Sequence, residues 1–346
     1  TKGHAGATVI PSLLAICSGL ANRGIKVSGK SFLEALVVGY EVSLRCGIAL
    51  HKETEDYPTS GAWAAVGVAA MGSCLLDLNQ QQVEHALGIA EYYGPRSPMM
   101  RCIDHPTMLK DGAGWGALAG TSALFLAQAG FTGAPSTLVS DYSEDTYFDQ
   151  YEILQQYFKP WPVCRWAQPA VEAIKALLDE NSISAESIEQ ISIETFHEAV
   201  RLGNKLPKNT EEAQYSIGFP VAAYTIRGEL GAKEILAETL RDQNIQQLQR
   251  RIVLKENSRH NHAFPERRYA SVTILLKDGE EFSKKDVEAS GDPHLPLPES
   301  EILDKFNTLS AASFSLNQQH ALITLIDSLD QKESCQPLFD TVLTVF

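Results

Sequence analysis

Four side chains that can carry positive charge lie close together within residues 92–120. They are Arg96, Arg101, His105 and Lys110. In a chain with a formal net charge of −14, a local excess of cations indicates an anion site. A guanidinium group can bind both oxygens of a carboxylate, so Arg96 and Arg101 are candidate substrate ligands. Bridging of helix ends is the structural alternative for these two arginines.

Lys110 comes immediately before the expected start of a glycine-rich helix. Free N–H groups at a helix N-terminus attract anions. Desolvation or a neighbouring cation can lower the pKa of a lysine, which would suit acid–base chemistry at Lys110. Gly112, Gly116 and Gly120 follow at intervals of four, and each costs the helix on the order of 1 kcal/mol. Such glycines indicate close packing or close approach of a ligand; packing alone explains the outer two.

Two further candidates lie earlier in the chain. His4 precedes the first expected helix, where histidine is neither a good cap nor a good core residue, and an exposed terminal histidine is the alternative. Tyr57 and Thr59 belong to the turn 57–61 and offer hydroxyl groups for further polar contacts.

Other well-known sites are not indicated. Gly112-Ala-Gly-Trp-Gly116 follows a loop rather than a strand and lacks the spacing of a phosphate-binding loop. No serine stands in a nucleophile elbow. His260 and His262 alternate in a polar segment, which favours two surface residues over a metal pair.

Composition indicates a soluble globular protein, with 44 % hydrophobic and 21 % charged residues. The negative charge argues against nucleic acid and against an anionic membrane surface. The longest apolar run, 62–76, is shorter than the roughly 20 residues that a membrane span needs. Six scattered cysteines without metal spacing predict buried free thiols in a reducing compartment. We therefore expect a cytoplasmic protein, with an organelle matrix after processing as the alternative.

The first 130 residues predict helices only. Apolar periodicity and capping signals place them at 9–23, 31–50, 60–76, 80–91 and 112–128. Ser31 with Glu34, and Asn79 with Gln82, resemble capping boxes. A loop region is expected at 131–151.

The pattern changes after the Lys159-Pro-Trp-Pro162 segment. Strands are predicted at 188–196, 252–255, 269–276 and 281–288, and helices at 165–180, 210–227 and 231–250. The expected fold is mainly α with an α+β part: a large all-helical domain and a smaller α+β domain with a mostly antiparallel sheet. We predict domain boundaries at 1–158 and 159–297, with C-terminal helices 298–346 returning to the helical domain.

Several segments resemble one family along the whole chain. His4-Ala-Gly-Ala-Thr-Val-Ile-Pro11, Phe158-Lys-Pro-Trp-Pro-Val-Cys164 and Lys305-Phe-Asn-Thr-Leu-Ser310 are similar to stretches of the MmgE/PrpD family. That family includes 2-methylcitrate dehydratases, cis-aconitate decarboxylases and iminodisuccinate epimerases. The resemblance implies a helical domain with an α+β lid, a homodimer, and no required metal or organic cofactor.

The resemblance also implies roles for single residues. His4 matches the active-site histidine, and Lys110 falls about where the family has a lysine. Tyr57 stands where many relatives have histidine, and Gln168 stands where decarboxylases have a lid histidine. An Asp that precedes the active-site histidine in decarboxylases would lie before Thr1, so the chain is expected to lack an N-terminal part.

These features predict a lyase (hydro-lyase) or isomerase. The first interpretation is a dehydratase acting on a small hydroxy di- or tricarboxylate, with His4 and Lys110 as acid and base. Tyr57, Thr59, Arg96, Arg101, His105 and Gln168 are the predicted substrate contacts. An epimerase, a cis-aconitate decarboxylase-like lyase and a non-catalytic dimeric relative are the alternatives.

Overall fold

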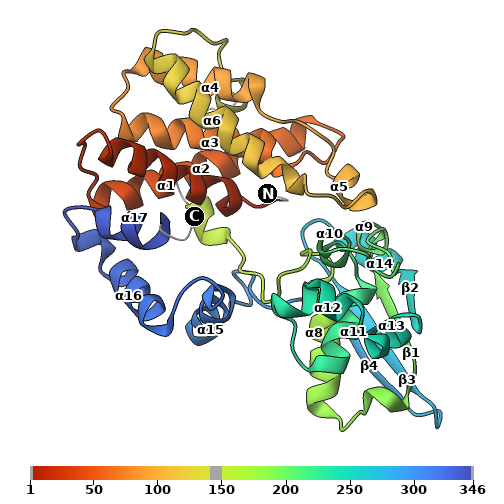
Figure 1. The fold of residues 1–346 in the computed structure, drawn as a ribbon. Coiled ribbons are helices and arrows are strands. Elements are labelled where there is room, and N and C mark those ends of the chain that lie inside the picture. The colour runs from red at the N-terminus through yellow and green to blue at the C-terminus, as the bar shows by residue number, and fades with distance from the viewer. Residues whose placement is uncertain (1–2, 141–149, 344–346) are drawn as a thin grey trace. The chain divides into compact units, whose positions relative to one another are not determined.

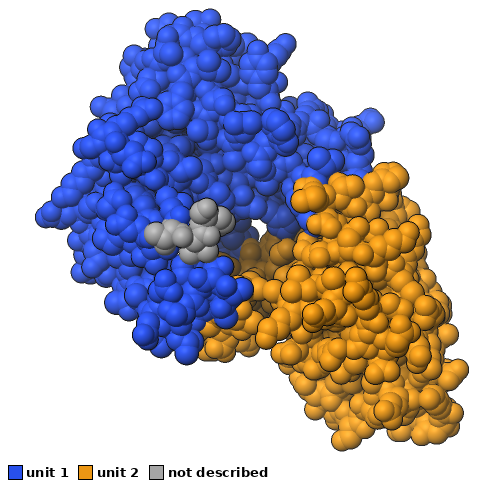
Figure 2. All heavy atoms as spheres, viewed as in Figure 1, with its two compact units in different colours: residues 1–102, 109–156, 310–346 blue, residues 103–108, 157–309 orange. Residues whose placement is uncertain are grey.

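The computed structural model describes residues 3–140 and 150–343, and the chain divides into two compact units (Figures 1 and 2). Unit 1 comprises residues 1–102, 109–156 and 310–346, and unit 2 comprises residues 103–108 and 157–309. The fold is mainly α with one small sheet, which confirms the predicted fold class. Part of the predicted loop region, 141–149, lies outside the described residues.

The regular secondary structure in the described part of unit 1 is helical, apart from an isolated bridge between Pro58 and Pro98. Its α-helices are α1 (Gly6–Ala21), α2 (Gly29–Glu53), α3 (Ser60–Leu75), α4 (Gln80–Tyr93), α5 (Met100–Asp104, whose last two residues are grouped with unit 2), α6 (Ala113–Gln128), α7 (Thr137–Ser140), α16 (Leu316–Asp327) and α17 (Gln336–Val342). Short 3-10 turns are η1 (Lys110–Gly112), η2 (Glu152–Gln155) and η5 (Leu329–Gln331).

Helix α3 forms the centre of unit 1. It contacts α1, α2, α4 and α6, and Trp63 within it is completely buried. A helix that is apolar on every side must be buried on every side, and the alanines and glycines of α3 meet that requirement. Gly67 shows how closely the helices approach, since an added Cβ there would lie 1.9 Å from Ser43 Oγ and 2.5 Å from Gly39 O of α2.

Two predicted helix starts had different outcomes. Asn79 and Gln82 form the expected reciprocal capping box at α4. Ser31 does not cap α2: the helix begins at Gly29, and Ser28 is the cap, its hydroxyl accepting a hydrogen bond from Ser31 N at 3.1 Å. Ser28, three residues earlier, has the same capping chemistry as Ser31, so the predicted helix start was three residues too late.

Unit 2 contains a four-stranded sheet in the order β2-β1-β3-β4. The strands are β1 (Ile188–Thr195), β2 (Ile252–Glu256), β3 (Ala270–Leu276) and β4 (Glu281–Val287). Only the β1–β2 pair is parallel, with Ile191 opposite Ile252, so the predicted mostly antiparallel sheet is confirmed. Ile191 and Ile193 are buried between the sheet and its helices.

The helices of unit 2 are shorter than predicted. They are α8 (Gln168–Glu180), α9 (His197–Val200), α10 (Thr210–Gln214), α11 (Gly218–Arg227), α12 (Ala237–Leu240), α13 (Gln243–Gln249), α14 (Ser258–Ala263) and α15 (Glu299–Ser310), with 3-10 turns η3 (Ala185–Ser187) and η4 (Lys233–Ile235). The stretch 231–250 is divided because Asp242 begins a new helix, accepting hydrogen bonds from Asn244 N and Ile245 N. Residues 299–309, expected with the C-terminal helices, are grouped with unit 2.

The histidine pair in α14 differs from the expectation. His260 is completely buried rather than at the surface, and its Nε2 lies 2.9 Å from Asp286 Oδ1. His262 is exposed, as expected. The described residues contain no group of three His, Cys, Asp or Glu side chains that could hold a metal ion. No helix within them has the length and apolar character to cross a membrane.

The cysteines are free thiols of differing exposure. Cys17, Cys46 and Cys335 are buried as predicted, whereas Cys74 is exposed. Burial raises the pKa of the Cys17 and Cys46 thiols from 9.0 to about 12. The neutral thiols suit the apolar surroundings, and their thiolates do not.

Replacing Gly67 with Ala should lower the free energy of unfolding by about 1–3 kcal/mol, because the added methyl group forces α2 and α3 apart. Gly19→Ala in α1 is the matched control, since nothing lies within 4 Å of an added Cβ there. That substitution should stabilise the protein by up to about 1 kcal/mol through helix propensity. Urea unfolding measures both; similar effects of the two substitutions would contradict the described helix contact.

The buried thiols predict a loss of stability at alkaline pH. The pKa of Cys17 and Cys46 in the folded protein lies above the ordinary thiol value of 9.0. Their contribution to the free energy of unfolding is therefore intact below pH 9 and is lost as the pH rises towards 12. Urea unfolding should therefore show a falling free energy above pH 9, and Cys46→Ala should make that fall shallower. An unchanged slope in Cys46→Ala would argue against burial of this thiol.

Candidate active site

The main chain at His4 is held by a buried hydroxyl group. His4 N donates a hydrogen bond to Ser60 Oγ at 2.9 Å, and Ser60 is almost completely buried at the start of α3. Gly3 permits this approach, because a Cβ there would lie 2.3 Å from Ser60 Oγ. The segment before α1 is therefore fixed against the first residue of α3.

Ser60 in turn binds a buried carboxylate next to Lys110. Ser60 N donates to Asp111 Oδ1 at 2.9 Å, and Ser60 Oγ donates to Asp111 Oδ2. Asp111 is buried. The hydrogen bonds thus connect the main chain of His4, through Ser60, to the residue that follows Lys110. The two predicted catalytic residues lie at the two ends of this connection.

The segment that carries Lys110 has an uncommon backbone conformation. Lys110, Asp111 and Gly112 have φ angles of 38°, 61° and 67°. A left-handed conformation costs a residue with a side chain roughly 1–2 kcal/mol, and such residues persist only where the surrounding structure holds them. Strained backbone of this kind occurs often at functional sites, so the turn supports a role for Lys110.

Asp111 also takes the place of a helix cap. Thr59 is the N-cap residue of α3 by position, but its side chain makes no capping hydrogen bond, and its Oγ1 donates to Pro95 O at 3.3 Å instead. The Asp111 carboxylate accepts the N–H of Ser60, where a helix N-terminus favours negative charge.

The turn 57–61 is braced by the chain before α5. Thr59 N donates to Ser97 O at 2.9 Å, and Met99 N donates to Tyr57 O at 2.6 Å. The Tyr57 ring lies 5.3 Å from the His51 ring, centroid to centroid. Tyr57 and Thr59 are therefore in rigid backbone beside the residues that hold His4 and Lys110.

The three spaced glycines serve different purposes. A Cβ at Gly116 would lie 2.7 Å from Gly61 O, and one at Gly120 would lie 2.4 Å from Ala65 O, so both permit α6 to approach α3. Gly112 has space for a Cβ, and its φ of 67° is what requires glycine. Packing therefore explains Gly116 and Gly120, whereas packing was expected at Gly112 and Gly120.

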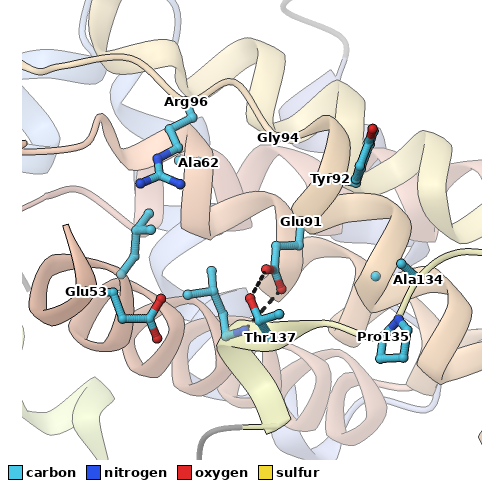
Figure 3. A pocket seen from close by; sticks show the side chains of 12 residues that line it. Glu53, Ala62, Glu91, Tyr92, Gly94, Arg96, Ala134, Pro135 and Thr137 are labelled. Atoms are coloured by element: carbon cyan, nitrogen blue, oxygen red, sulfur yellow. Dashed lines mark hydrogen bonds between the residues drawn. The ribbon is translucent and has the colours of Figure 1, made fainter.

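The arginines of the predicted cation cluster have separate surroundings. Arg96 lines a small cavity of about 260 Å3 together with Glu53 and Glu91, and its side chain extends towards Ala62 (Figure 3). Arg96 makes no hydrogen bond or ion pair with any of residues 3–140 and 150–343. Arg101 Nη1 lies 3.3 Å from Ser97 Oγ, to which it donates.

The Glu91 carboxylate in the same cavity has a structural role. It accepts a hydrogen bond from Thr137 Oγ1 at 2.6 Å (Figure 3). It also accepts hydrogen bonds from Ser136 Oγ at 2.5 Å and from Leu138 N at 3.2 Å. These donors lie at the start of α7, so Glu91 holds that short helix to α4.

His105 and Gln168 belong to unit 2. His105 follows Asp104, whose carboxylate pairs with Arg201 Nη2 at 2.5 Å. Gln168 is completely buried at the start of α8, and its Nε2 donates to Trp161 O at 2.9 Å and to Val163 O at 3.1 Å. The Gln168 amide thus stabilises the turn after Lys159, and its contact with substrate stays a prediction.

A lysine outside the predicted set lies in a cavity of unit 2. This cavity, of about 760 Å3, is lined by residues that include Trp161, Tyr224 and Lys305. Burial lowers the pKa of Lys305, whose Nζ donates to Lys159 O. That hydrogen bond gives Lys305 a structural role in holding the Lys159 segment.

Ser60 and Asp111 were not predicted from the sequence. The Asp111-Gly112 pair was a usable signal, since Asp and Gly adopt left-handed turns more readily than other residues. Ser60 belongs to the turn 57–61 that the sequence indicated, but only Tyr57 and Thr59 of that turn were predicted as site residues.

Comparisons with known proteins agree with this architecture. The MmgE/PrpD N-terminal domain matches residues 1–151, and the MmgE/PrpD C-terminal domain matches residues 161–331. Cis-aconitate decarboxylase from Mus musculus is 23 % identical over 97 % of this chain and 72 % of its own length. Cis-aconitate decarboxylase from Homo sapiens is 23 % identical over 97 % of this chain and 73 % of its own length. The resemblance is thereby confirmed, and the chain is an enzyme of the MmgE/PrpD family.

Proposed function

We propose that the protein is a lyase that removes water from a small hydroxy di- or tricarboxylate, in the manner of a 2-methylcitrate dehydratase. The observation that carries the proposal is the connection of the His4 and Lys110 segments through Ser60 and Asp111. The enzyme needs a base and an acid held in fixed positions, and these two residues are its acid–base candidates.

The proposed reaction is an elimination. A base removes a proton from the carbon next to a carboxylate, the electron pair of that C–H bond forms the C=C bond, and the C–O bond breaks. The acid gives its proton to the leaving hydroxyl group, which departs as water. His4 and Lys110 supply the base and the acid. Cations near the carboxylates stabilise the negative charge that develops on carbon.

Arg96 and Arg101 are the proposed carboxylate ligands. The guanidinium of Arg96 supports this role, because no described residue occupies its donors. Tyr57, Thr59, His105 and Gln168 are proposed as further substrate contacts. Among them, Tyr57 and Thr59 have the braced backbone that precise contacts need.

Decarboxylation of cis-aconitate is the second candidate, because both relatives carry that name. In that reaction a C–C bond breaks, carbon dioxide leaves, and the acid protonates the carbon that keeps the electron pair. It needs the same cations and acid but no leaving hydroxyl group. An epimerase would instead return a proton to the same carbon without net loss of a group.

Incubation with 2-methylcitrate, citrate and cis-aconitate separates these reactions. A dehydratase forms an alkene from one of the first two acids, seen by ultraviolet absorbance, and a decarboxylase releases carbon dioxide from the third. Hydrogen–deuterium exchange without net product indicates an epimerase. Release of carbon dioxide without alkene formation would overturn the dehydratase proposal.

His4→Asn and Lys110→Met should each lower kcat about 10²- to 10⁴-fold, since each removes one acid–base group. His262→Asn and Lys30→Met are the matched controls, because both side chains are exposed. Steady-state kinetics on the converted acid give the comparison. Full activity in His4→Asn and Lys110→Met would refute the assignment of both residues.

We also propose that two copies of the chain associate through α6. Residues 113–128 contain no charged side chain, yet Trp115 and Leu118 are 65 % and 53 % exposed. Burial of such a face against a second copy would remove apolar surface from water.

Replacing both Trp115 and Leu118 with Glu should convert a dimer to a monomer, because two carboxylates cannot be buried without partners. Light scattering after size-exclusion chromatography gives the molecular mass. Leu316→Glu is the control, since Leu316 is 71 % exposed on α16 and should leave the mass unchanged. A wild-type protein with the mass of a single chain would rule out the proposed dimer.

A further inference from the structure

We propose that Ser60 and Asp111 are positioning residues that fix the main chain at His4 and Lys110 for the reaction. The inference rests on the proposed roles of His4 and Lys110, and it adds two residues that touch neither substrate nor product. Three observations support it: the direction of the hydrogen bonds, the left-handed backbone of residues 110–112, and the close packing of the segments that carry them.

The hydrogen bonds have only one consistent direction. Asp111 accepts from Ser60 N at 2.9 Å and from Ser60 Oγ, so its carboxylate acts as an acceptor at both oxygens. The single hydroxyl proton of Ser60 is used on Asp111, and an oxygen lone pair remains for His4 N at 2.9 Å. The Asp111 carboxylate therefore orients the hydroxyl group that holds His4.

The same carboxylate holds the turn that carries Lys110. Lys110, Asp111 and Gly112 are all left-handed, and such a turn relaxes unless other contacts fix it. The Ser60–Asp111 hydrogen bonds fix its centre. Its far end is restrained where Ala113 O accepts from Thr8 Oγ1 at 3.4 Å. Loss of the carboxylate should free Lys110 to change its backbone conformation.

The packing leaves little space for an alternative arrangement. A Cβ at Gly61 would lie 2.2 Å from Gly112 O, and one at Gly3 would lie 2.3 Å from Ser60 Oγ. The segments of Ser60 and Asp111 are therefore in backbone contact, and the segment of His4 packs against the Ser60 side chain. A small displacement of one of them is transmitted to the others.

A purely structural role is the competing explanation, and unit 1 contains a matched example of it. Glu41 also binds the start of a helical turn, since its Oε1 accepts from Ile153 N at 2.8 Å and its Oε2 pairs with Arg45. It has no hydrogen bond to His4 or Lys110. Ser73 is the matching serine, a buried residue of α3 whose Oγ donates to Ala69 O at 2.7 Å.

The test compares Ser60→Ala and Asp111→Asn with the controls Ser73→Ala and Glu41→Gln. The first readout is hydrogen exchange of the His4 amide, followed by NMR in protein labelled with 15N at histidine and assigned by the missing signal in His4→Gln. The second is exchange of the amides at 109–113 by mass spectrometry. The third is kcat and KM on whichever of 2-methylcitrate, citrate and cis-aconitate is converted.

Ser60→Ala should speed exchange of the His4 amide and of the amides at 109–113, and Asp111→Asn should do the same more strongly at 109–113. Both should lower kcat up to about 100-fold, with smaller changes in KM, because misplaced groups still bind substrate. The variant with both substitutions should lose little more of kcat than either single variant, since each substitution already breaks the hydrogen-bonded pair of Ser60 and Asp111. Both controls should leave exchange at these amides and kcat unchanged.

Unchanged exchange of the His4 amide in Ser60→Ala would overturn the inference, as would equal losses of kcat in Ser60→Ala and Ser73→Ala. Additive losses in the double variant would also contradict it. If the wild-type protein converts none of the three acids, the proposed function fails, and amide exchange alone then decides whether Ser60 and Asp111 fix both segments.

Discussion

The close approach of α3 and α6 is the constraint on which the rest of unit 1 depends. Gly61 meets Gly116, and Ala65 meets Gly120, so the two helices run in the same direction with backbones in contact. Helices in this arrangement begin beside each other. The segments before them, 57–60 and 109–112, are therefore neighbours although they lie far apart in the sequence.

This arrangement also concentrates positive potential. Each helix N-terminus carries a partial positive charge, and two such termini lie together at Ser60 and Ala113. Asp111 offsets part of that charge while it caps α3. The local field can thus favour an anion in a chain whose net charge is −14. Net charge describes the whole surface, and the potential at a site depends on the groups nearest to it.

The sequence predicted the elements better than it predicted the site. Apolar periodicity and the Asn79 capping box identified most helices of unit 1, and the alternation in β3 identified the sheet, because these signals are local. The Ser60–Asp111 contact joins residues 51 positions apart, and no local pattern encodes it. The cation cluster was a local observation too, but the fold gives its members different partners: Ser97 for Arg101 and a cavity for Arg96.

Unit 1 is assembled from separated stretches of chain, and this has a consequence for its synthesis. Its last part contacts its first, since Gly29 N donates to Lys332 O at 2.8 Å and Cys335 N donates to Val27 O at 2.9 Å. Unit 2 has all of its residues once position 309 has been translated, whereas unit 1 still lacks α16, η5 and α17. Domains fold as units as they leave the ribosome. Unit 1 is therefore completed after unit 2, and the parts of α1 and α2 that contact α17 and η5 stay uncovered until those two elements have been translated.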